Sequence, residues 1–532
     1  MKHSQKCYVV LLTATLAAAG LRLPQLQQRP MHTDEAVHAV KFGTLLEEGQ
    51  YRYNPNEFHG PTLNYLTLIP AWLSSAEKLT EVSEFTLRIV PVFFGVLLVL
   101  LLLLLADGLG WAAAICAAVL TTVSPAMVFY SRYYVQEMLL VCFIFGAIIC
   151  GYRYSQSKSI RWALSTGIFM GLCYATKETS IIAFGSMLLA LLLTLLMCRS
   201  QAGSALNIKK RVRPWHIIAA AATAVIVSAL FYSSFLTNAA GILDSLRAYG
   251  IYFNRAGENA LHIHPWYYYL KMLIYSRYAG GPAWSEGLIV ILAAAGFVVA
   301  MTGRNIIGAD CRLLRFIAFY TLIMTVVYSA IPYKTPWCML GFLHGMIILA
   351  AVGVVAVIKL APSALVRTII SLLLVVSGGH LAWQACLGSY KYCADPANPY
   401  VYAHTGTDIY TIVQRVEDIA AVHPDGRKMP IQVICPEHDY WPLPWYLRSF
   451  SRVYWWNQIG ENELPAPVII APPSLKPALL EFFDRPPPGK KNLYMRLFDT
   501  YVELRPQVEL LGFVTKDLRD SYRQYQTPGG EK

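Results

Sequence analysis

The feature that most constrains this chain is a series of long apolar runs separated by short polar segments. Eleven runs precede residue 387, each close to the roughly 20 residues with which a helix crosses a bilayer. Of the 532 residues, 56% are hydrophobic and only 14% are charged, an apolar share above that of ordinary soluble domains. The sequence therefore predicts a mainly α, multi-pass membrane bundle. The expected spans are 7–23, 85–106, 111–130, 136–152, 160–176, 179–198, 215–236, 286–303, 315–331, 336–358 and 366–386.

A further apolar segment, residues 62–79, decides the topology, because counting it as a span would reverse every later helix. If it lies in the membrane interface, the loops on one side carry fifteen Lys and Arg residues but only two acids, Asp107 and Asp310. Such a basic excess is typical of the cytoplasmic side, and the polar residues within 62–79 suit a headgroup boundary. We therefore expect a protein of the plasma (inner) membrane with a cytoplasmic N-terminus and an extracytoplasmic C-terminus.

The chain changes character after residue 386, where prolines, charges and short β-like runs replace the continuous apolar helices. Strands are expected at 429–435, 451–456 and 466–471, and helices at 407–423 and 474–483. This alternation predicts a small α/β domain. The chain would then consist of a transmembrane domain, 1–386, whose first outer loop is 24–84, and an extracytoplasmic domain, 387–532.

The cysteines and the common motifs narrow the function classes. Most of the 11 cysteines fall inside predicted membrane helices, where cysteine behaves as a small apolar residue. Cys393 and Cys435 are outward exceptions, and a disulfide between them is an option if the compartment oxidises. The sequence has no Walker loop, Rossmann glycine pattern, zinc-ligand spacing or internal repeat of fixed period.

Several charged residues fall at predicted helix ends, and this topology places all of them on the outer side. They are Arg132, Glu137, Lys177, Glu178 and Lys334. A charge at membrane depth is costly, so these residues need partners or a water-filled cavity. Each one alone could be a side chain that reaches the interface from a helix end. Their concentration on one face favours a functional site.

A pair of adjacent carboxylates, Asp34 and Glu35, lies in the first outer loop within RPMHTDEAVHAVKF. One interpretation is structural: the segment is typical of a helix capped by Thr33 or Asp34, with acids that stabilise its N-terminal dipole. Capping and chemistry are compatible, because a helix N-terminus would hold Asp34 in one place and keep it ionised. An ionised, positioned carboxylate is what a general base needs.

An Asp-Glu pair just after the first membrane helix resembles the signature of the GT-C glycosyltransferases, membrane enzymes that use lipid-phosphate sugars. The chain is similar to the protein O-mannosyltransferase and aminoarabinose-transferase branch, whose first outer loop carries the acidic pair and two juxtamembrane helices. Residues 34–49 and 62–79 match that plan. HGPTLNYL (59–66), SRYYVQEMLL in the second outer loop and ATKETS after the fifth span add to the resemblance. PYKTPWC and DYWPLPWYLR (439–448) resemble the flippase-activity-associated subfamily.

The resemblance implies an inverting transfer of a sugar from a polyprenyl-phosphate donor to an acceptor hydroxyl at the outer membrane face. Asp34 would take the proton of the acceptor, with Glu35 beside it. Cations placed in a low-dielectric pocket stabilise the phosphate charge that grows as the bond breaks. The available cations are Lys177, Arg132 and Lys334.

Three histidines are further candidates for substrate contact. His59 belongs to the family-like HGP turn. His262 and His264 precede the aromatic run 266–269 and could stack on sugar rings or grip the lipid headgroup. That run could instead be an interfacial aromatic belt.

No cofactor is implied with certainty. Aminoarabinose-transferase relatives often carry an Asp in the second outer loop, where this chain has Glu137 and Arg132. Asp34 together with Glu137 could hold a divalent cation through oxygen ligands, but the sequence contains no defined metal site.

Two other classes remain open. A transporter or flippase of lipid-linked sugars should have charges nearer the midplane, or matched broken helices in two halves. A non-catalytic scaffold would explain the C-terminal domain but would leave Asp34 and Glu35 without a role. The expected partners are a polyprenyl-phosphate sugar and membrane lipid, with no nucleic acid. The sequence does not choose the sugar, or a protein, lipid or glycan acceptor.

Overall fold

The computed structural model describes residues 2–56, 59–202, 213–255, 262–303, 308–487 and 491–526. The chain divides into two compact units. The membrane unit comprises Met1–Leu26, Thr44–Ser75 and Ser83–Tyr402. The C-terminal unit comprises Gln27–Gly43, Ala76–Val82 and Ala403–Lys532. Two segments of the first outer loop therefore group with the C-terminal residues. The predicted boundary at 386 coincides with the end of the last long helix, whereas the two units divide after Tyr402.

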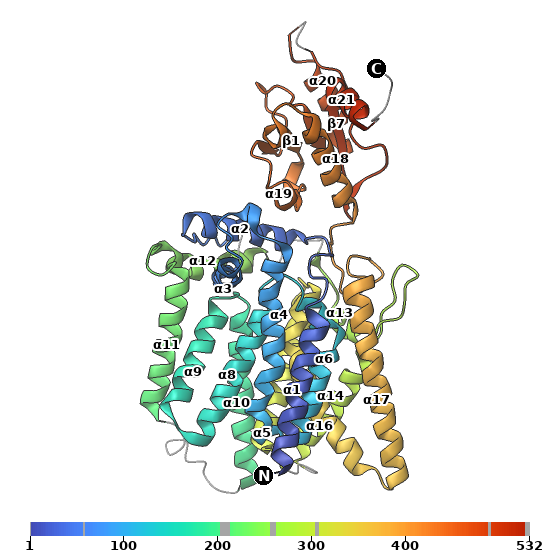
Figure 1. The fold of residues 1–532 in the computed structure, drawn as a ribbon. Coiled ribbons are helices and arrows are strands. Elements are labelled where there is room, and N and C mark those ends of the chain that lie inside the picture. Colours follow the sequence, from blue (N-terminus) through green and yellow to red (C-terminus); the bar gives the residue numbers. More distant parts are fainter. Residues whose placement is uncertain are drawn as a thin grey trace. The chain divides into compact units, whose positions relative to one another are not determined.

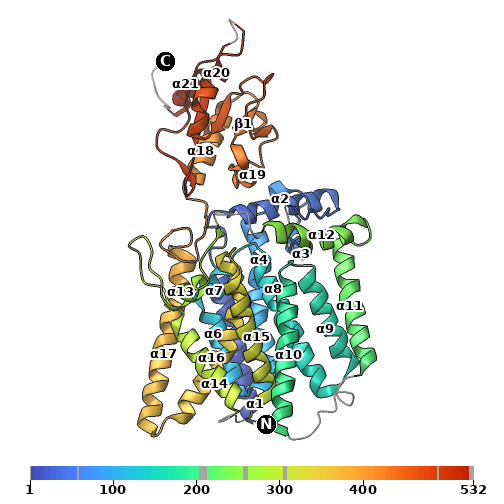
Figure 2. The same cartoon turned by 180° about the vertical axis from the view of Figure 1, so that it is seen from behind.

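Helices make up the membrane unit, and the long ones run side by side (Figures 1 and 2). They are α1 (Lys2–Arg22), α3 (Thr62–Leu73), α4 (Glu84–Leu101), α5 (Ala106–Leu109), α6 (Trp111–Val123), α7 (Pro125–Tyr130), α8 (Glu137–Ser157), α9 (Ile160–Tyr174), α10 (Ser180–Ala202), α11 (Pro214–Tyr232), α12 (Ala240–Arg255), α13 (Tyr268–Ile274), α14 (Gly287–Thr302), α15 (Cys311–Ala330), α16 (Leu340–Leu360) and α17 (Ala364–Cys386). Helix α2 (Thr33–Glu48) is shared by the two units.

Every predicted span contains a helix, which confirms the mainly helical membrane class. Within the described residues, seven helical stretches are long and apolar enough to cross a membrane. They are Glu84–Leu109, Glu137–Ser157, Ser180–Cys198, Pro214–Tyr232, Cys311–Ala330, Pro336–Leu360 and Ala364–Lys391. Helices α6 and α14 are apolar but shorter, so the total of eleven spans stays a prediction. Helix α3 has 12 residues and runs across the long helices (Figure 1), and its interfacial placement also stays a prediction.

The loops predicted to face inward meet at one end of the membrane unit. Arg153 Nη1 lies 3.0 Å from Asp107 Oδ2, and Gln156 Nε2 donates to Asp310 Oδ2 at 3.0 Å. The basic segment 203–212 lies outside the described residues. Each long helix has one of these inward loops at one end and a predicted outer segment at the other. The polar clusters of the membrane unit therefore lie at the end opposite to the inward loops. Which end faces the cytoplasm stays a prediction.

Glycines allow a close helix contact between α14 and α16. A Cβ atom at Gly296 would lie 1.9 Å from the carbonyl oxygen of Leu349, and one at Gly353 would lie 2.1 Å from that of Leu292. Small residues at helix crossings let backbones approach in membranes, where there is no hydrophobic force between helices. These two positions therefore fix the packing of the two helices.

The C-terminal unit contains a five-stranded sheet in the order β2-β1-β3-β7-β4. Strand β1 is parallel to β2 and β3, while β7 is antiparallel to β3 and β4. The strands are β1 (Ile431–Ile434), β2 (Val453–Trp456), β3 (Val468–Ala471), β4 (Tyr494–Arg496) and β7 (Leu511–Thr515), with a separate pair β5 (Glu503–Arg505) and β6 (Val508–Glu509). The helices are α18 (Asp408–Val422), α19 (Leu443–Tyr446), α20 (Lys476–Phe483) and α21 (Lys516–Gln526).

The α/β prediction for this region is confirmed, with the three expected strands and both expected helices in place. Every residue of β1 and β3 is buried, as expected for central strands covered on both faces. The optional disulfide is absent, because Cys393 and Cys435 are both free. Cys435 is fully buried in the core of the C-terminal unit, where it packs as an apolar side chain.

Candidate active site

The acidic pair lies in the first turn of α2, in the C-terminal unit. Ala36 N donates to His32 O at 3.0 Å, so His32 is the residue that precedes the helix. Its ring Nδ1 accepts the backbone N–H of Asp34 at 3.1 Å, while Glu35 Oε2 accepts the backbone N–H of His32 at 2.9 Å. This exchange resembles a capping box, with His32 in the place usual for Ser or Thr. The expectation that Thr33 or Asp34 caps the helix is therefore wrong, because the imidazole nitrogen takes that role.

The two carboxylates differ in exposure and in partners. Glu35 is fully buried, and its Oε1 accepts a hydrogen bond from Arg29 Nη2 at 2.9 Å. Asp34 keeps 47% of its side chain exposed, with Oδ2 at 3.9 Å from His32 Nδ1. Since that ring nitrogen accepts the Asp34 N–H, it carries no proton to share with the carboxylate. Asp34 thus has the access that a base needs, and Glu35 has fixed partners.

The membrane unit holds a buried ion pair between Lys177 and Glu137. Glu137 begins α8, and Lys177 lies in the turn between α9 and α10, so the pair joins the second outer loop to the ATKETS segment. Each charge compensates the other, because an ion left alone in such a place would be strongly destabilising. Two predicted site residues are therefore in direct contact.

The HGP turn lies against the ATKETS segment. Gly60 permits this, because a Cβ there would be 2.2 Å from the carbonyl oxygen of Ala175. His59 Nδ1 contacts Glu178 Oε2 at 2.8 Å, and the Tyr53 hydroxyl donates to Glu178 Oε1 at 2.8 Å. Burial acts to raise the pKa of Glu178, but the charge and hydrogen bond of His59, with hydrogen bonds from the backbone and from Tyr53, together outweigh it, and the pKa lies below its usual range. Glu178 is thus held as a carboxylate.

Arg132 binds the C-terminal end of α1 and the residues that follow it. Its guanidinium donates to the carbonyl oxygens of Arg22 at 2.7 Å, Pro24 at 2.6 Å and Gln25 at 3.1 Å. It also lies 4.8 Å from the centroid of the Tyr390 ring. These contacts fix the start of the first outer loop. A donor phosphate bound to Arg132 would have to share its guanidinium with these carbonyl oxygens.

The segments that contain His262 and Lys334 pair as two short extended stretches. Lys334 N donates to His262 O at 2.9 Å, and His264 N donates to Pro332 O at 3.1 Å. The Lys334 ammonium donates to the carbonyl oxygens of Ile331 and of His264. Burial lowers the pKa of Lys334. Residues 256–261 of the first segment, like residues 57 and 58 of the HGP segment, lie outside the described residues.

Tyr402 joins the two histidines. Its hydroxyl lies 2.6 Å from His262 Nδ1 and 3.4 Å from His264 Nε2. His264 stacks on Tyr268 with ring centroids 4.2 Å apart. Burial is the largest cause that lowers the pKa of His264, followed by the nearby charges of His262 and Lys334.

Sequence reasoning missed Glu286, a fully buried carboxylate just before α14. It accepts hydrogen bonds from the Ser124 hydroxyl, from Ala126 N at 2.9 Å and from the Tyr400 hydroxyl at 2.8 Å. The signal in the sequence that could have identified Glu286 was a charged residue at the edge of a predicted span. Glu286 holds the start of α7, which leads into the SRYYVQE segment.

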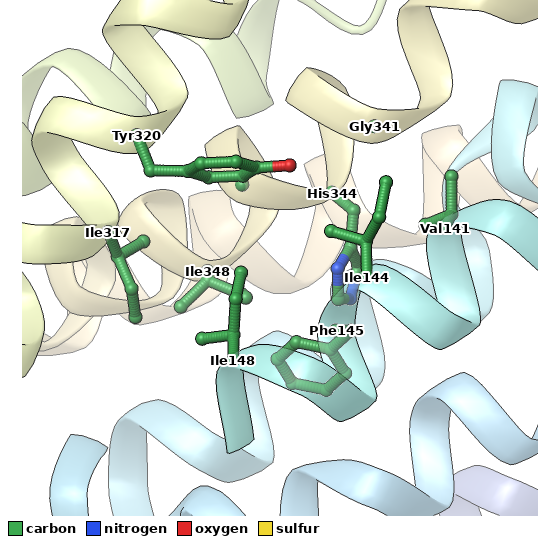
Figure 3. Close-up of a pocket in the computed structure, with 10 residues that line it drawn as sticks. Val141, Ile144, Phe145, Ile148, Ile317, Tyr320, Gly341, His344 and Ile348 are labelled. Atoms are coloured by element: carbon green, nitrogen blue, oxygen red, sulfur yellow. The ribbon is translucent and has the colours of Figure 1, made fainter. Parts of the chain in front are cut away.

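A hollow of about 370 Å³ lies at the end of the membrane unit predicted to face inward, where Asp107, Trp111 and Lys359 line it. Within the described ranges, no group of three or more His, Cys, Asp and Glu side chains could hold a metal ion. A cavity of about 20 Å³ lies between α8, α15 and α16, where the Tyr320 hydroxyl points toward the side on which His344 lies (Figure 3). This space suits one water-sized molecule and is far too small for a sugar ring.

The fold is similar to that of ArnT from Cupriavidus metallidurans. The apo crystal structure aligns with a TM-score of 0.63 and 14% identity, covering 96% of this chain and 98% of that chain. The crystal structure bound to undecaprenyl phosphate aligns with a TM-score of 0.62 and 14% identity, covering 95% and 97%. The class is therefore a multi-pass membrane protein with an ArnT-like fold over nearly its whole length.

A family model described as dolichyl-phosphate-mannose-protein mannosyltransferase matches residues 68–240. A comparison with curated protein sequences finds no match. The fold and the family match both agree with the resemblance read from the sequence to the protein O-mannosyltransferase and aminoarabinose-transferase branch. The matched range contains the Glu137 and Lys177 segments, whereas Asp34 and Glu35 precede it.

Proposed function

We propose that this protein is an inverting glycosyltransferase that moves a sugar from a polyprenyl-phosphate donor to an acceptor hydroxyl at the outer membrane face. The observation that carries the proposal is the division of the acidic pair into an accessible Asp34 and a buried, ion-paired Glu35. The ArnT-like fold supports the class of donor, since one of the similar structures is bound to undecaprenyl phosphate.

Asp34 is the general base in this account. It lies in the first turn of α2, and 47% of its side chain is exposed. Its carboxylate takes no part in capping, so it can accept a proton without loss of the helix start. Glu35 cannot serve in the same way, because both its oxygens already accept hydrogen bonds.

The transfer balances without a second nucleophile. The acceptor oxygen forms a bond to the anomeric carbon while the bond from that carbon to the phosphate oxygen breaks. The acceptor proton passes to Asp34, and the lipid leaves as polyprenyl phosphate with the bonding electron pair. A single displacement of this kind inverts the anomeric configuration, whereas retention would need an enzyme nucleophile on the opposite face.

Lys177 is the cation best suited to the developing phosphate charge. It is buried and ends a turn in the cluster that also contains Glu137, His59 and Glu178. In a site of low dielectric, such a cation stabilises the separated charge more than it would in water. Lys334 and Arg132, with His262 and His264, are secondary candidates for donor contact.

The direct test is transfer by the purified full-length protein in liposomes. A polyprenyl-phosphate donor labelled in the sugar is supplied together with protein, lipid and glycan acceptors. The proposal predicts label on one acceptor class, an equal amount of released polyprenyl phosphate, and inverted anomeric configuration in the product. Label that crosses the liposome membrane while still attached to its lipid would favour transport and contradict the proposal.

A further inference from the structure

The motif DYWPLPWYLR, residues 439–448, has no part in the transfer described above. In the C-terminal unit, however, two of its side chains contact the first outer loop. Tyr446 contacts the segment that leads into α2, and Arg448 contacts the segment that follows α3. Both segments belong to the C-terminal unit, so these are contacts within one compact body.

The backbone of Met31 is held on both sides by C-terminal residues. Its N–H donates to the Tyr446 hydroxyl at 2.8 Å, and its carbonyl oxygen accepts from the Thr405 hydroxyl at 2.7 Å. Thr405 and Met31 are buried. The rings of His404 and the capping residue His32 meet with centroids 5.0 Å apart. The residues just before Asp34 thus have their backbone groups satisfied by a domain more than 370 positions away in sequence.

Arg448 supports α2 further along the helix, by binding the segment that packs against Gly43. Its guanidinium donates to Val82 O at 3.0 Å and to Leu79 O at 3.3 Å, and lies 3.7 Å from the centroid of the Trp445 ring. Leu79 packs directly on α2, because a Cβ at Gly43 would lie 2.9 Å from its side chain. The C-terminal domain therefore supports α2 both just before its start and, through Leu79, at Gly43 within the helix.

We propose that Tyr446, Thr405 and Arg448 are positioning residues that hold α2 so that Asp34 keeps one place relative to its own unit. The inference rests on the proposed role of Asp34 as the base. A loop segment loses much conformational entropy when it is ordered, and a base works only within hydrogen-bond reach of the proton it takes. The C-terminal domain orders the segment before α2, so that Asp34 is already in place when the acceptor binds.

Hydrogen exchange of the full-length protein in detergent tests the positioning itself, without reference to activity. In Tyr446→Phe and Thr405→Val, exchange of the peptide covering 29–36 should rise by roughly three- to tenfold, the range for one neutral hydrogen bond. Tyr494→Phe is the matched control, since the Tyr494 hydroxyl donates to Ala466 O at 2.9 Å within the same unit but away from α2. Unchanged exchange at 29–36 in both test variants would overturn the inference.

Kinetics then link the positioning to Asp34. Tyr446→Phe should lower kcat by a similar factor and leave the apparent KM for the donor unchanged, because donor contacts are untouched. In an Asp34→Asn background, Tyr446→Phe should have no further effect on the residual rate, since residues that act through one another are not additive. An equal loss in both backgrounds would overturn the inference. Absence of transfer by the unmodified protein would instead contradict the proposed function, and the exchange comparison would still decide whether the domain holds α2.

Discussion

Glu35 forms a buried ion pair with Arg29, with 2.9 Å between Oε1 and Nη2. Neither side chain has appreciable contact with solvent, and Glu35 also accepts the backbone N–H of His32. The charge of Glu35 is therefore committed to the local structure of the first outer loop. The neighbouring carboxylate of Asp34 is not.

The first prediction concerns this pair. Glu35→Gln keeps the shape but removes the carboxylate that lies 2.9 Å from the buried Arg29 guanidinium, and the loss of one partner of a buried pair typically costs about 3–5 kcal/mol. Thermal unfolding in detergent should show a clear loss of stability. The double variant Arg29→Met with Glu35→Gln should be closer to the unmodified protein, because both charges of the pair are removed together. A single variant as stable as the unmodified protein would show that the pair has no structural role.

The second prediction concerns donor binding. Lys177→Met should weaken binding of a polyprenyl-phosphate ligand by about 1.5–3 kcal/mol, the range for a hydrogen bond to a charged group. Glu137→Gln should not weaken it, because this change removes the competitor that pairs with Lys177 and keeps the shape. Direct binding in detergent measures both. If Lys177→Met and Lys334→Met both left the affinity unchanged, neither lysine would be a phosphate contact.

The third prediction follows from the lowered pKa of Glu178. An unfolded glutamate has a pKa of about 4.3, and the folded value is lower, so this carboxylate contributes stability above that value. The contribution is lost as pH falls through the folded pKa. The gap in Tm between the unmodified protein and Glu178→Gln should therefore narrow below about pH 4. A gap that stays constant from pH 7 to pH 3 would contradict the carboxylate's role.

The fourth prediction concerns the helix crossing between α14 and α16. Gly353→Ala places a Cβ 2.1 Å from a backbone carbonyl and should destabilise the bundle by about 1–3 kcal/mol, as overpacking does. Gly379→Ala, in α17, is the control, because nothing lies within 4 Å of a Cβ there. Thermal unfolding of both variants in the same detergent compares them. If Gly353→Ala and Gly379→Ala unfolded at the same temperature, the close approach of α14 and α16 would not contribute to stability.

The sequence predicted those features that depend on local pattern. Apolar runs of membrane length coincide with helices, and short β-rich runs coincide with β1, β2 and β3. Strands β4 and β7 were missed, because the antiparallel pairing of β7 with β3 and of β4 with β7 joins residues that are far apart in the chain. Strand β4 has only three residues, too few for an alternation to be recognised.

The sequence identified residues of the candidate site, but it did not predict which residues they contact. The acidic pair and Lys177 could be read from charges in apolar surroundings, but their partners could not. His32 was missed as the capping residue because an imidazole is an unusual cap, although Glu35 three residues later was a signal. Arg132 was expected to bind phosphate, and its carbonyl partners near residue 24 appear only when the segment between α7 and α8 packs against the end of α1.

The measurement that tests the central claim most directly is the rate of glycosyl transfer by Asp34→Asn in the full-length, membrane-inserted protein. Since His32 and Glu35 cap α2, Asn at this position should leave the helix and the fold unchanged while removing the base. Transfer should fall by about 10²–10⁴-fold, the usual contribution of a positioned general base, while donor binding persists. Asp425→Asn, a change at a carboxylate of the same unit that is 54% exposed, should transfer at the normal rate. Near-normal transfer by Asp34→Asn would contradict the assignment of Asp34 as the base.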